Sequence, residues 1–264
     1  MKNRLLHFIV LSLLCAANIY ASIKGQIFSS ETKQPIGYVS VGSSSRSFGM
    51  VADSLGRFMF NVTPRLNDSL LISSIGYEPT VVSLSELRDS VFLTPCQQKL
   101  SEIVVTPRKK KKIGNVYGKS GLGYVVIYTD DKQEVGRVFD ISKNCIVRNV
   151  RLNVFTPQEV RLRLNVYGNV DGKWESVLNK NVFWPSLAKN NDDYSSHVYE
   201  LVLEEPLVLE KGEYLISVED VSNSTEQIIF VSRLLTGHAK YRSKVLGEWK
   251  DLEVNLGMEI DIEY

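Results

Sequence analysis

Apolar residues at every second position recur along this 264-residue chain, and this alternation constrains its fold most. Residues 160–166 and 258–264 alternate apolar side chains with arginine, asparagine or carboxylate side chains. A period of two places the two sets on opposite faces of an extended strand, one face in a core and one in water. No stretch shows a convincing helical period. The sequence therefore predicts an all-β protein.

The first 21 residues have the three parts of a secretory signal peptide. Lys2 and Arg4 give the positive start, an apolar stretch follows, and Ala21 offers a small residue for cleavage. Cys15 could instead anchor a lipoprotein, but the bulky Leu14 before it argues against this alternative. The apolar stretch is shorter than the roughly 20 residues of a membrane span. We expect an exported protein of the periplasm, outer membrane or cell surface, with no transmembrane span.

Charge divides the rest of the chain into a neutral, a basic and an acidic part. Residues 22–107 carry seven bases and seven acids, whereas residues 113–264 carry 17 bases and 23 acids. Between them stand Arg108 and four lysines, Lys109 to Lys112. We predict a first domain at 22–98, a basic linker at 99–116 and a second domain at 117–264. The basic run is either a solvated linker or a contact for anionic lipid, and no broad basic face suggests nucleic acid.

Two cysteines remain after the signal peptide. Cys96 and Cys145 fall in different predicted domains, so the sequence leaves open whether they form a disulfide or stay as separate thiols. Either way, two cysteines exclude a disulfide-rich scaffold. Apolar cores must stabilise both domains.

In the first domain, seven short alternating segments are separated by Gly, Pro, Asn and Ser, which favours a seven-stranded antiparallel sandwich. Residues 53–58 read as a tight turn in which Gly56 takes a positive φ. Asp53 and Ser54 could also offer oxygens to calcium, but the alternating carboxylates of an EF-hand-type loop are missing.

Four motifs in this domain carry a family resemblance. These are residues 25–27, 35–41, the Asp53-x-x-Gly56-Arg57-Phe58 turn and residues 75–78. Together they resemble the carboxypeptidase-like regulatory domain, a transthyretin-like, Greek-key sandwich that often precedes TonB-dependent outer-membrane receptors in Bacteroidetes. The resemblance implies an assembly or docking module of the cell envelope. Residues 100–107 are similar to the segment that leads into the receptor plug, yet the chain is too short for a plug and barrel.

The second domain repeats the two-residue period, and an Asp-Gly pair at residues 171–172 predicts a tight hairpin. About eight to ten strands are expected, which favours a jelly-roll-like sandwich. Residues 207–219 weakly resemble the strand pair found in secreted adhesin and carbohydrate-binding jelly rolls.

One polar loop of the second domain offers candidate ligand-binding residues. Trp184 and Tyr194 could stack on a sugar ring, while Asp192 and Asp193 accept hydroxyl hydrogen bonds or hold calcium. A buried Trp184 beside a flexible loop is the alternative. We expect no catalytic residues, cofactor or metal site, because no zinc motif, nucleophile elbow or selected carboxylate pair occurs.

The sequence thus predicts a non-enzymatic envelope protein with a spacer or docking sandwich and a binding sandwich. The partner would be a glycan, a peptide or another envelope protein, which could dock on an exposed strand edge. A periplasmic accessory of a TonB-dependent receptor and a divergent hydrolase are the alternatives.

Overall fold

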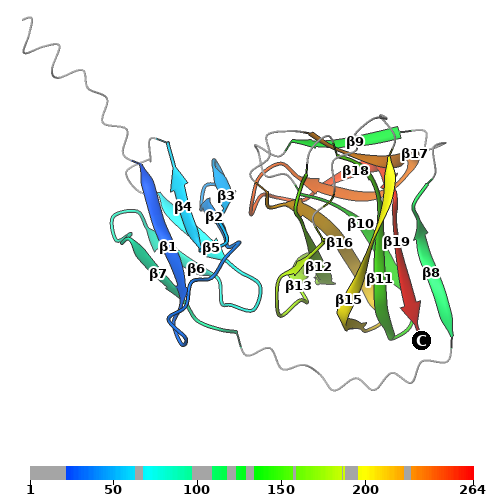
Figure 1. Ribbon diagram of the computed structural model, residues 1–264, viewed down its shortest axis with the longest axis horizontal. Coiled ribbons are helices and arrows are strands. Elements are labelled where there is room, and N and C mark those ends of the chain that lie inside the picture. Colours follow the sequence, from blue (N-terminus) through cyan, green and yellow to red (C-terminus); the bar gives the residue numbers. More distant parts are fainter. Residues whose placement is uncertain are drawn as a thin grey trace, which may run out of the picture.

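The computed structural model describes residues 22–62, 68–96, 109–117, 123–128, 134–156, 159–185, 187, 196–222 and 227–264. Every regular element in these ranges is a strand, which confirms the prediction of an all-β chain (Figure 1). No helix that could span a membrane occurs within these ranges.

The first domain consists of two small sheets. One has the order β4-β1-β7 and the other β3-β2-β5-β6. Their bounds are β1 (Ile23–Ser29), β2 (Ser40–Ser43), β3 (Gly49–Val51), β4 (Arg57–Phe60), β5 (Ser69–Ser73), β6 (Thr80–Ser83) and β7 (Ser90–Leu93). Ile27, Leu70, Ile72 and Leu93 are fully buried in the core of this domain. Seven strands in two small sheets agree with the sequence prediction, but β1 and β7 pair in parallel, so the expected purely antiparallel pairing is wrong at this strand.

The turn before β4 forms as its sequence predicts. The Asp53 carboxylate accepts hydrogen bonds from the backbone N–H groups of Leu55 and Arg57, both at 2.8 Å. Gly56 follows with a φ of 73°. A Cβ at this glycine would lie 2.5 Å from the Ile36 carbonyl oxygen, so no other residue fits without movement.

The second domain is one network of 12 hydrogen-bonded strands. Its main path runs β13-β12-β16-β10-β17-β11-β19-β8, and β14, β15, β18 and β9 pair beside this path. The strand bounds are β8 (Lys110–Asn115), β9 (Gly123–Tyr128), β10 (Glu134–Ile141), β11 (Cys145–Phe155), β12 (Leu162–Val170), β13 (Lys173–Ser176), β14 (Val182–Phe183), β15 (His197–Leu209), β16 (Gly212–Asp220), β17 (Gln227–Arg242), β18 (Lys250–Leu256) and β19 (Met258–Glu263).

Strand β17 joins the two halves of this network. Its first half pairs with β9 and β11, its second half pairs with β10, and β18 pairs with residues from both halves. Inward side chains from both halves form one core, in which Leu152, Leu162, Leu164 and Phe230 are at most 1% exposed. The predicted Asp-Gly hairpin joins β12 to β13, with φ values of 51° at Asp171 and 81° at Gly172.

This network differs from the predicted jelly-roll-like sandwich of eight to ten strands. Twelve strands form, and the two halves share hydrogen bonds through β17 instead of standing as separate sheets. The sequence could not reveal this, because alternation of apolar and polar residues shows which face of a strand is buried but not which strands it pairs with.

The predicted basic linker at 99–116 is wrong in its second half. Lys110–Asn115 is strand β8, which pairs with β19 in antiparallel register from Glu263 to Met258. Lys109 and Tyr264 also exchange backbone hydrogen bonds of 2.9 and 3.0 Å. The second domain therefore includes Lys109, and the rest of the expected linker, 97–108, lies outside the described residues.

The two cysteines among the described residues are free thiols. Cys96 is exposed near the end of the first domain, whereas Cys145 is buried in the second. Burial raises the pKa of the Cys145 thiol to about 11.

Candidate binding site at the domain junction

A row of four charged residues crosses four neighbouring strands of the second domain. Arg163 on β12 lies opposite Glu219 on β16, which lies opposite Glu134 on β10, which lies opposite Arg242 on β17. The order of charges is positive, negative, negative, positive. All four residues are at most 8% exposed, so this charged row is buried.

The strand period places this row on the face away from the core. Leu162 and Leu164 flank Arg163 in sequence and point into the core, so Arg163 must point outward. The same alternation applies to Glu219, because Val218 beside it is a core residue. The outward face of this sheet is therefore charged, and the first domain and nearby loops cover it.

Hydrogen bonds hold the two carboxylates of the charged row in place. Glu134 Oε1 accepts from Asn165 at 2.9 Å, Tyr167 at 3.2 Å and Ser217 at 2.5 Å. Glu134 Oε2 forms an ion pair with Arg242. These contacts fix the position of the Glu134 side chain in the row.

The second carboxylate of the row pairs with the other arginine. Arg163 Nη2 lies 2.5 Å from Glu219 Oε2. Burial by itself raises the pKa of Glu219, but the positive charges of Arg163 and Arg242 outweigh burial and lower the net value. Glu219 Oε1 and Arg242 Nε have no hydrogen-bond partner among the described residues.

The first domain covers one end of the charged row. Arg163 donates to the backbone carbonyl of Tyr38, and to Ser40 Oγ at 3.2 Å. Arg161 donates to the Tyr38 hydroxyl at 2.8 Å, and its guanidinium lies 5.1 Å from the Phe183 ring centroid. Tyr38 itself has a φ of 59°, a left-handed conformation that a non-glycine residue rarely adopts. This strained residue is thus held by contacts from both domains.

A loop of the second domain makes further contacts with the first. Val245, only 2% exposed, packs where Gly42 and Gly49 leave space, and a Cβ at Gly49 would lie 3.2 Å from Val245 Cβ. Lys244 Nζ donates to the Ser47 carbonyl at 2.8 Å, and Arg46 pairs with Glu248. Polar and apolar contacts together therefore join the two domains.

Three aromatic rings gather at the open end of the charged row, and we call them the aromatic cluster: Tyr167, Trp174 and Trp249. The rings of Tyr167 and Trp249 lie 5.7 Å apart in an edge arrangement. Arg242 lies 4.9 Å from the Trp249 ring centroid, and Lys240 Nζ lies 5.8 Å from that of Trp174. Each of the three residues is half-buried, so the cluster borders solvent. The Tyr167 hydroxyl donates to Glu134 in the charged row, and burial of this end of the side chain is the main cause that raises its pKa.

The ligand-binding residues expected from the sequence do not form this site. Trp184 is 1% exposed and belongs to the core, so it offers no open face to a sugar. This corrects the expectation of a Trp184 platform: its backbone pairs with Leu162 beside β12, which directs the ring inward. Asp192, Asp193 and Tyr194 lie outside the described residues.

Sequence reasoning missed the charged row because it assigned the polar face of β12 to water. Arg163 and Asn165 alternate with leucines as surface residues do, yet both are only 3% exposed. Their burial depends on the first domain, which sequence periodicity cannot place. The available signal was Glu219 and Asp220, two adjacent acids at the end of a strand whose middle, Tyr214 to Val218, is mostly apolar.

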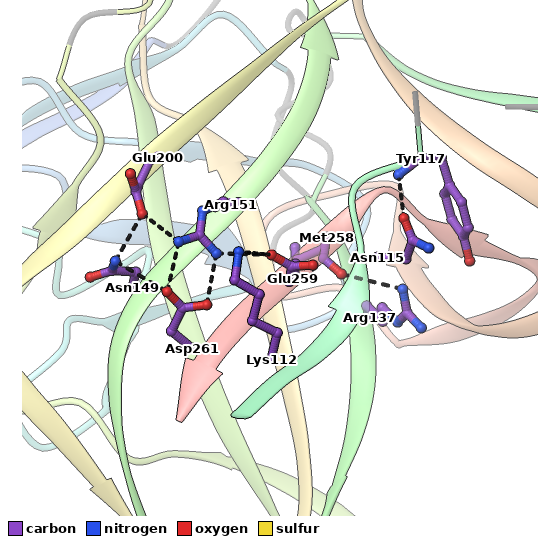
Figure 2. A network of polar contacts seen from close by, with 10 residues as sticks. All are labelled: Lys112, Asn115, Tyr117, Arg137, Asn149, Arg151, Glu200, Met258, Glu259 and Asp261. Carbon is purple, nitrogen blue, oxygen red and sulfur yellow. Dashed lines mark hydrogen bonds and ion pairs between the residues drawn. The ribbon is translucent and has the colours of Figure 1, made fainter. Parts of the chain in front are cut away.

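A second charged network attaches β8 to the far edge of the second domain (Figure 2). Arg151 on β11 contacts Glu259 at 2.8 Å and Asp261 at 2.6 Å on β19, and Glu200 at 2.7 Å on β15. Lys112 on β8 lies 3.3 Å from Glu259. The hydrogen bond from Arg151 lowers the pKa of Asp261. Two of the five basic residues, Lys110 and Lys112, thus pair with acidic residues of their own chain.

Metal binding finds no support in the parts of the chain that the structure describes. No group of three or more His, Cys, Asp or Glu side chains there is arranged to hold a metal ion. The two carboxylates of the charged row pair with arginines instead.

Comparison with known proteins identifies the first domain. Residues 23–105 match the CarboxypepD_reg-like domain family, and no curated protein matches the chain. Among solved structures, a clostridial cysteine protease, Cwp84 after propeptide cleavage, has 14% identity and a TM-score of 0.42, with 81% of this chain and 54% of that chain covered.

The capsid protein of infectious bursal disease virus is also similar in outline. Its VP2 subviral particle has 9% identity and a TM-score of 0.28, with 92% of this chain and 64% of that chain covered. This chain therefore spans less than two thirds of either structure, and such low scores carry no functional argument. Residues 23–105 are thus a CarboxypepD_reg-like domain, as the sequence motifs predicted.

Proposed function

We propose that this chain is a non-enzymatic, exported binding protein of the cell envelope, and that its second domain binds a glycan at the aromatic cluster. The observation that carries the proposal is the grouping of Tyr167, Trp174 and Trp249 beside Lys240 and Arg242 at the border of solvent. Flat aromatic faces pack against sugar rings, and a few placed polar groups fix the orientation of a ligand.

The polar groups beside the cluster support this proposal. Glu219 Oε1 and Arg242 Nε are an acceptor and a donor without partners among the described residues. Such groups are costly when buried, and sugar hydroxyls can both donate and accept hydrogen bonds. The charged row would then form the polar side of the site.

The role proposed for the first domain is that of a rigid support. Arg163, Tyr38 and Val245 connect the two domains through buried contacts. The first domain would hold the aromatic cluster at a fixed place in the envelope.

A glycan array with the purified chain tests the binding proposal. We expect binding, and about tenfold weaker binding for Trp174→Ala, which corresponds to the ~1.4 kcal/mol of one stacked aromatic ring. Tyr124→Ala is the matched control, because Tyr124 is an exposed aromatic residue on β9, 65% exposed and outside the cluster. Absence of glycan binding, or an equal loss in both variants, would remove the proposal.

Strand β15 supports a second candidate function, the docking of an extended peptide from a partner protein. It has 13 residues and pairs with β11 on one side. Val198 and Val202 on it are 50% and 64% exposed. A partner strand could complete the hydrogen bonds of such an edge. Binding of envelope extracts that Val202→Glu abolishes and Trp174→Ala leaves intact would favour this function.

Protease treatment of whole cells tests the proposed location. A surface protein would be degraded, whereas a periplasmic accessory of a receptor would be spared. Detection of the uncleaved chain in the cytoplasm alone would contradict export.

A further inference from the structure

The sheet β4-β1-β7 presents a face away from the second domain that is both basic and apolar (Figure 1). We call it the outer face, and it is formed by Lys24, Lys33, Arg57, Met59 and Phe92. Met59 and Phe92 are 56% and 49% exposed. Large apolar side chains exposed together on a sheet indicate an interaction surface.

Strand alternation creates this face. On β4, Phe58 and Phe60 point into the core, so Arg57 and Met59 point outward. Lys24 lies directly opposite Met59 in the ladder between β1 and β4. A cation and an exposed apolar side chain therefore stand side by side.

The third strand repeats this arrangement. Phe92 on β7 pairs with Phe28 on β1, and their rings lie 5.7 Å apart. Lys33 Nζ lies 5.1 Å from the Phe92 ring centroid. The outer face thus has apolar groups on both outer strands, each beside a lysine.

The charge of this face has one sign. The outward positions of the three strands, all of which the structure describes, contain Lys24, Gln26, Phe28, Arg57, Met59, Ser90 and Phe92, and no acid. The second domain has the opposite balance, since residues 113–264 carry 23 acids and 17 bases. An anionic surface would attract the outer face and repel the second domain, which orients the molecule.

From this charge complementarity we infer that the outer face binds the surface of an anionic lipid membrane. Long basic side chains keep their charged ends among lipid headgroups while their stems cover apolar surface. Met59 and Phe92 would enter the boundary between headgroups and acyl chains, as the apolar side of an interfacial helix does. The inference is independent of the glycan proposal, because it concerns another domain and other residues.

The basic run at 108–112 is a weaker place for this contact. Lys110 and Lys112 lie 3.2 and 3.3 Å from Glu263 and Glu259, so acids of the same chain offset their charge. The outward positions of β1, β4 and β7 hold no carboxylate beside Lys24 and Arg57. The outer face of the first domain is therefore a stronger candidate for a lipid contact than the basic run.

Sedimentation with vesicles tests the inference. We expect the purified protein to bind vesicles of phosphatidylcholine with phosphatidylglycerol at low salt, and to bind pure phosphatidylcholine at least about tenfold more weakly, since each basic residue near an anionic surface contributes measurably. Lys24→Glu with Arg57→Glu should lower binding to the anionic vesicles about tenfold or more. Lys109→Glu with Lys111→Glu is the matched control with the same charge change, and it should retain binding.

A second variant distinguishes a membrane from an acidic protein. Met59→Ser with Phe92→Ser leaves every charge in place and should also weaken vesicle binding. Unchanged vesicle binding in this variant, together with full competition by soluble polyglutamate, would show a site for acidic proteins and overturn the inference. Absence of vesicle binding, or an equal loss in the Lys109 and Lys111 control, would overturn it as well. Circular dichroism spectra of all variants check that they fold.

Discussion

The second domain contains two charged networks that use the same residue types at different depths. The first domain covers the Arg163 end of the charged row Arg163-Glu219-Glu134-Arg242, and the side chains of Glu219 and Glu134 are 0% and 1% exposed. The network around Arg151 lies on β15, β11, β19 and β8, and its partner Glu200 is 43% exposed. Removal of water strengthens attraction between charges and also raises the cost of leaving one unpaired.

This difference predicts where a single substitution matters. In the charged row, each ion depends on its partner, because the junction keeps water away. Around Arg151, water and three acids share the charge of one arginine. The networks should therefore differ in their response to mutation, pH and salt.

The largest effect is expected from breaking the buried pair. Glu219→Gln keeps the shape of the side chain but leaves Arg163 with no full negative partner at 2.5 Å. We expect a loss of about 3–5 kcal/mol in the free energy of unfolding, as for other buried pairs that lose one member. Urea denaturation measures this. A loss below about 1 kcal/mol, the usual worth of an exposed pair, would show that water enters the junction.

Replacing both members of the pair should cost less than replacing one. Arg163→Met with Glu219→Leu removes both charges and fills the volume with apolar groups, which is often neutral in proteins. We expect a coupling energy of roughly 2 kcal/mol or more in a double-mutant cycle measured by denaturation. Additive losses would contradict direct pairing and point to an independent role of Arg163 at Tyr38 and Ser40.

Acid should weaken both networks, and the buried one more. The pKa of Glu219 and that of Asp261 are lowered in the folded protein from usual values of 4.5 and 3.8. Groups of this kind stabilise the fold fully above their unfolded pKa, and this stability is lost as the pH falls through the folded value. Denaturation midpoints between pH 6 and pH 3 should fall, with a shallower fall in Glu219→Gln than in Asp261→Asn. The reverse order would contradict the comparison.

A smaller effect on stability is expected in the network around Arg151. Arg151→Met should cost about 1 kcal/mol, and this cost should shrink in 1 M salt, where the screening length is about 3 Å. Lys110→Met is the control, because its side chain is 87% exposed and its pairing with Glu263 should contribute almost nothing. A salt-independent loss at Arg151 would mean that its packing, not its charge, stabilises β8.

Periodicity predicted the strands because it reports which side of a strand meets a core. It correctly placed Leu162 and Leu164 inside, and the Asp171-Gly172 pair correctly predicted a hairpin. It failed where a second domain covers a polar face, as at Arg163, because burial there depends on contacts far apart in sequence. The prediction of a linker was wrong for a related reason. Five basic residues in a row favour a solvated segment, but β19 carries acids and pairs with β8.

The candidate site was predictable only in its residue types. Aromatic and charged side chains were expected to form it, and Trp184 was chosen because it stands in a polar segment. The pairing of Trp184 with the edge of β12 turns that ring into the core. Trp174 and Trp249 instead lie at the surface, because a hairpin and a loop bring them to β17.

The pairing of β8 with β19 has a consequence for how this protein is made. The first strand of the second domain forms its ladder with the last, and β17 must also be present to join the halves. The domain cannot close until its final residues have emerged, so most of it stays unfolded during synthesis. Late closure leaves strand edges unpaired for longer, so a variant that lacks β19 should be prone to aggregation.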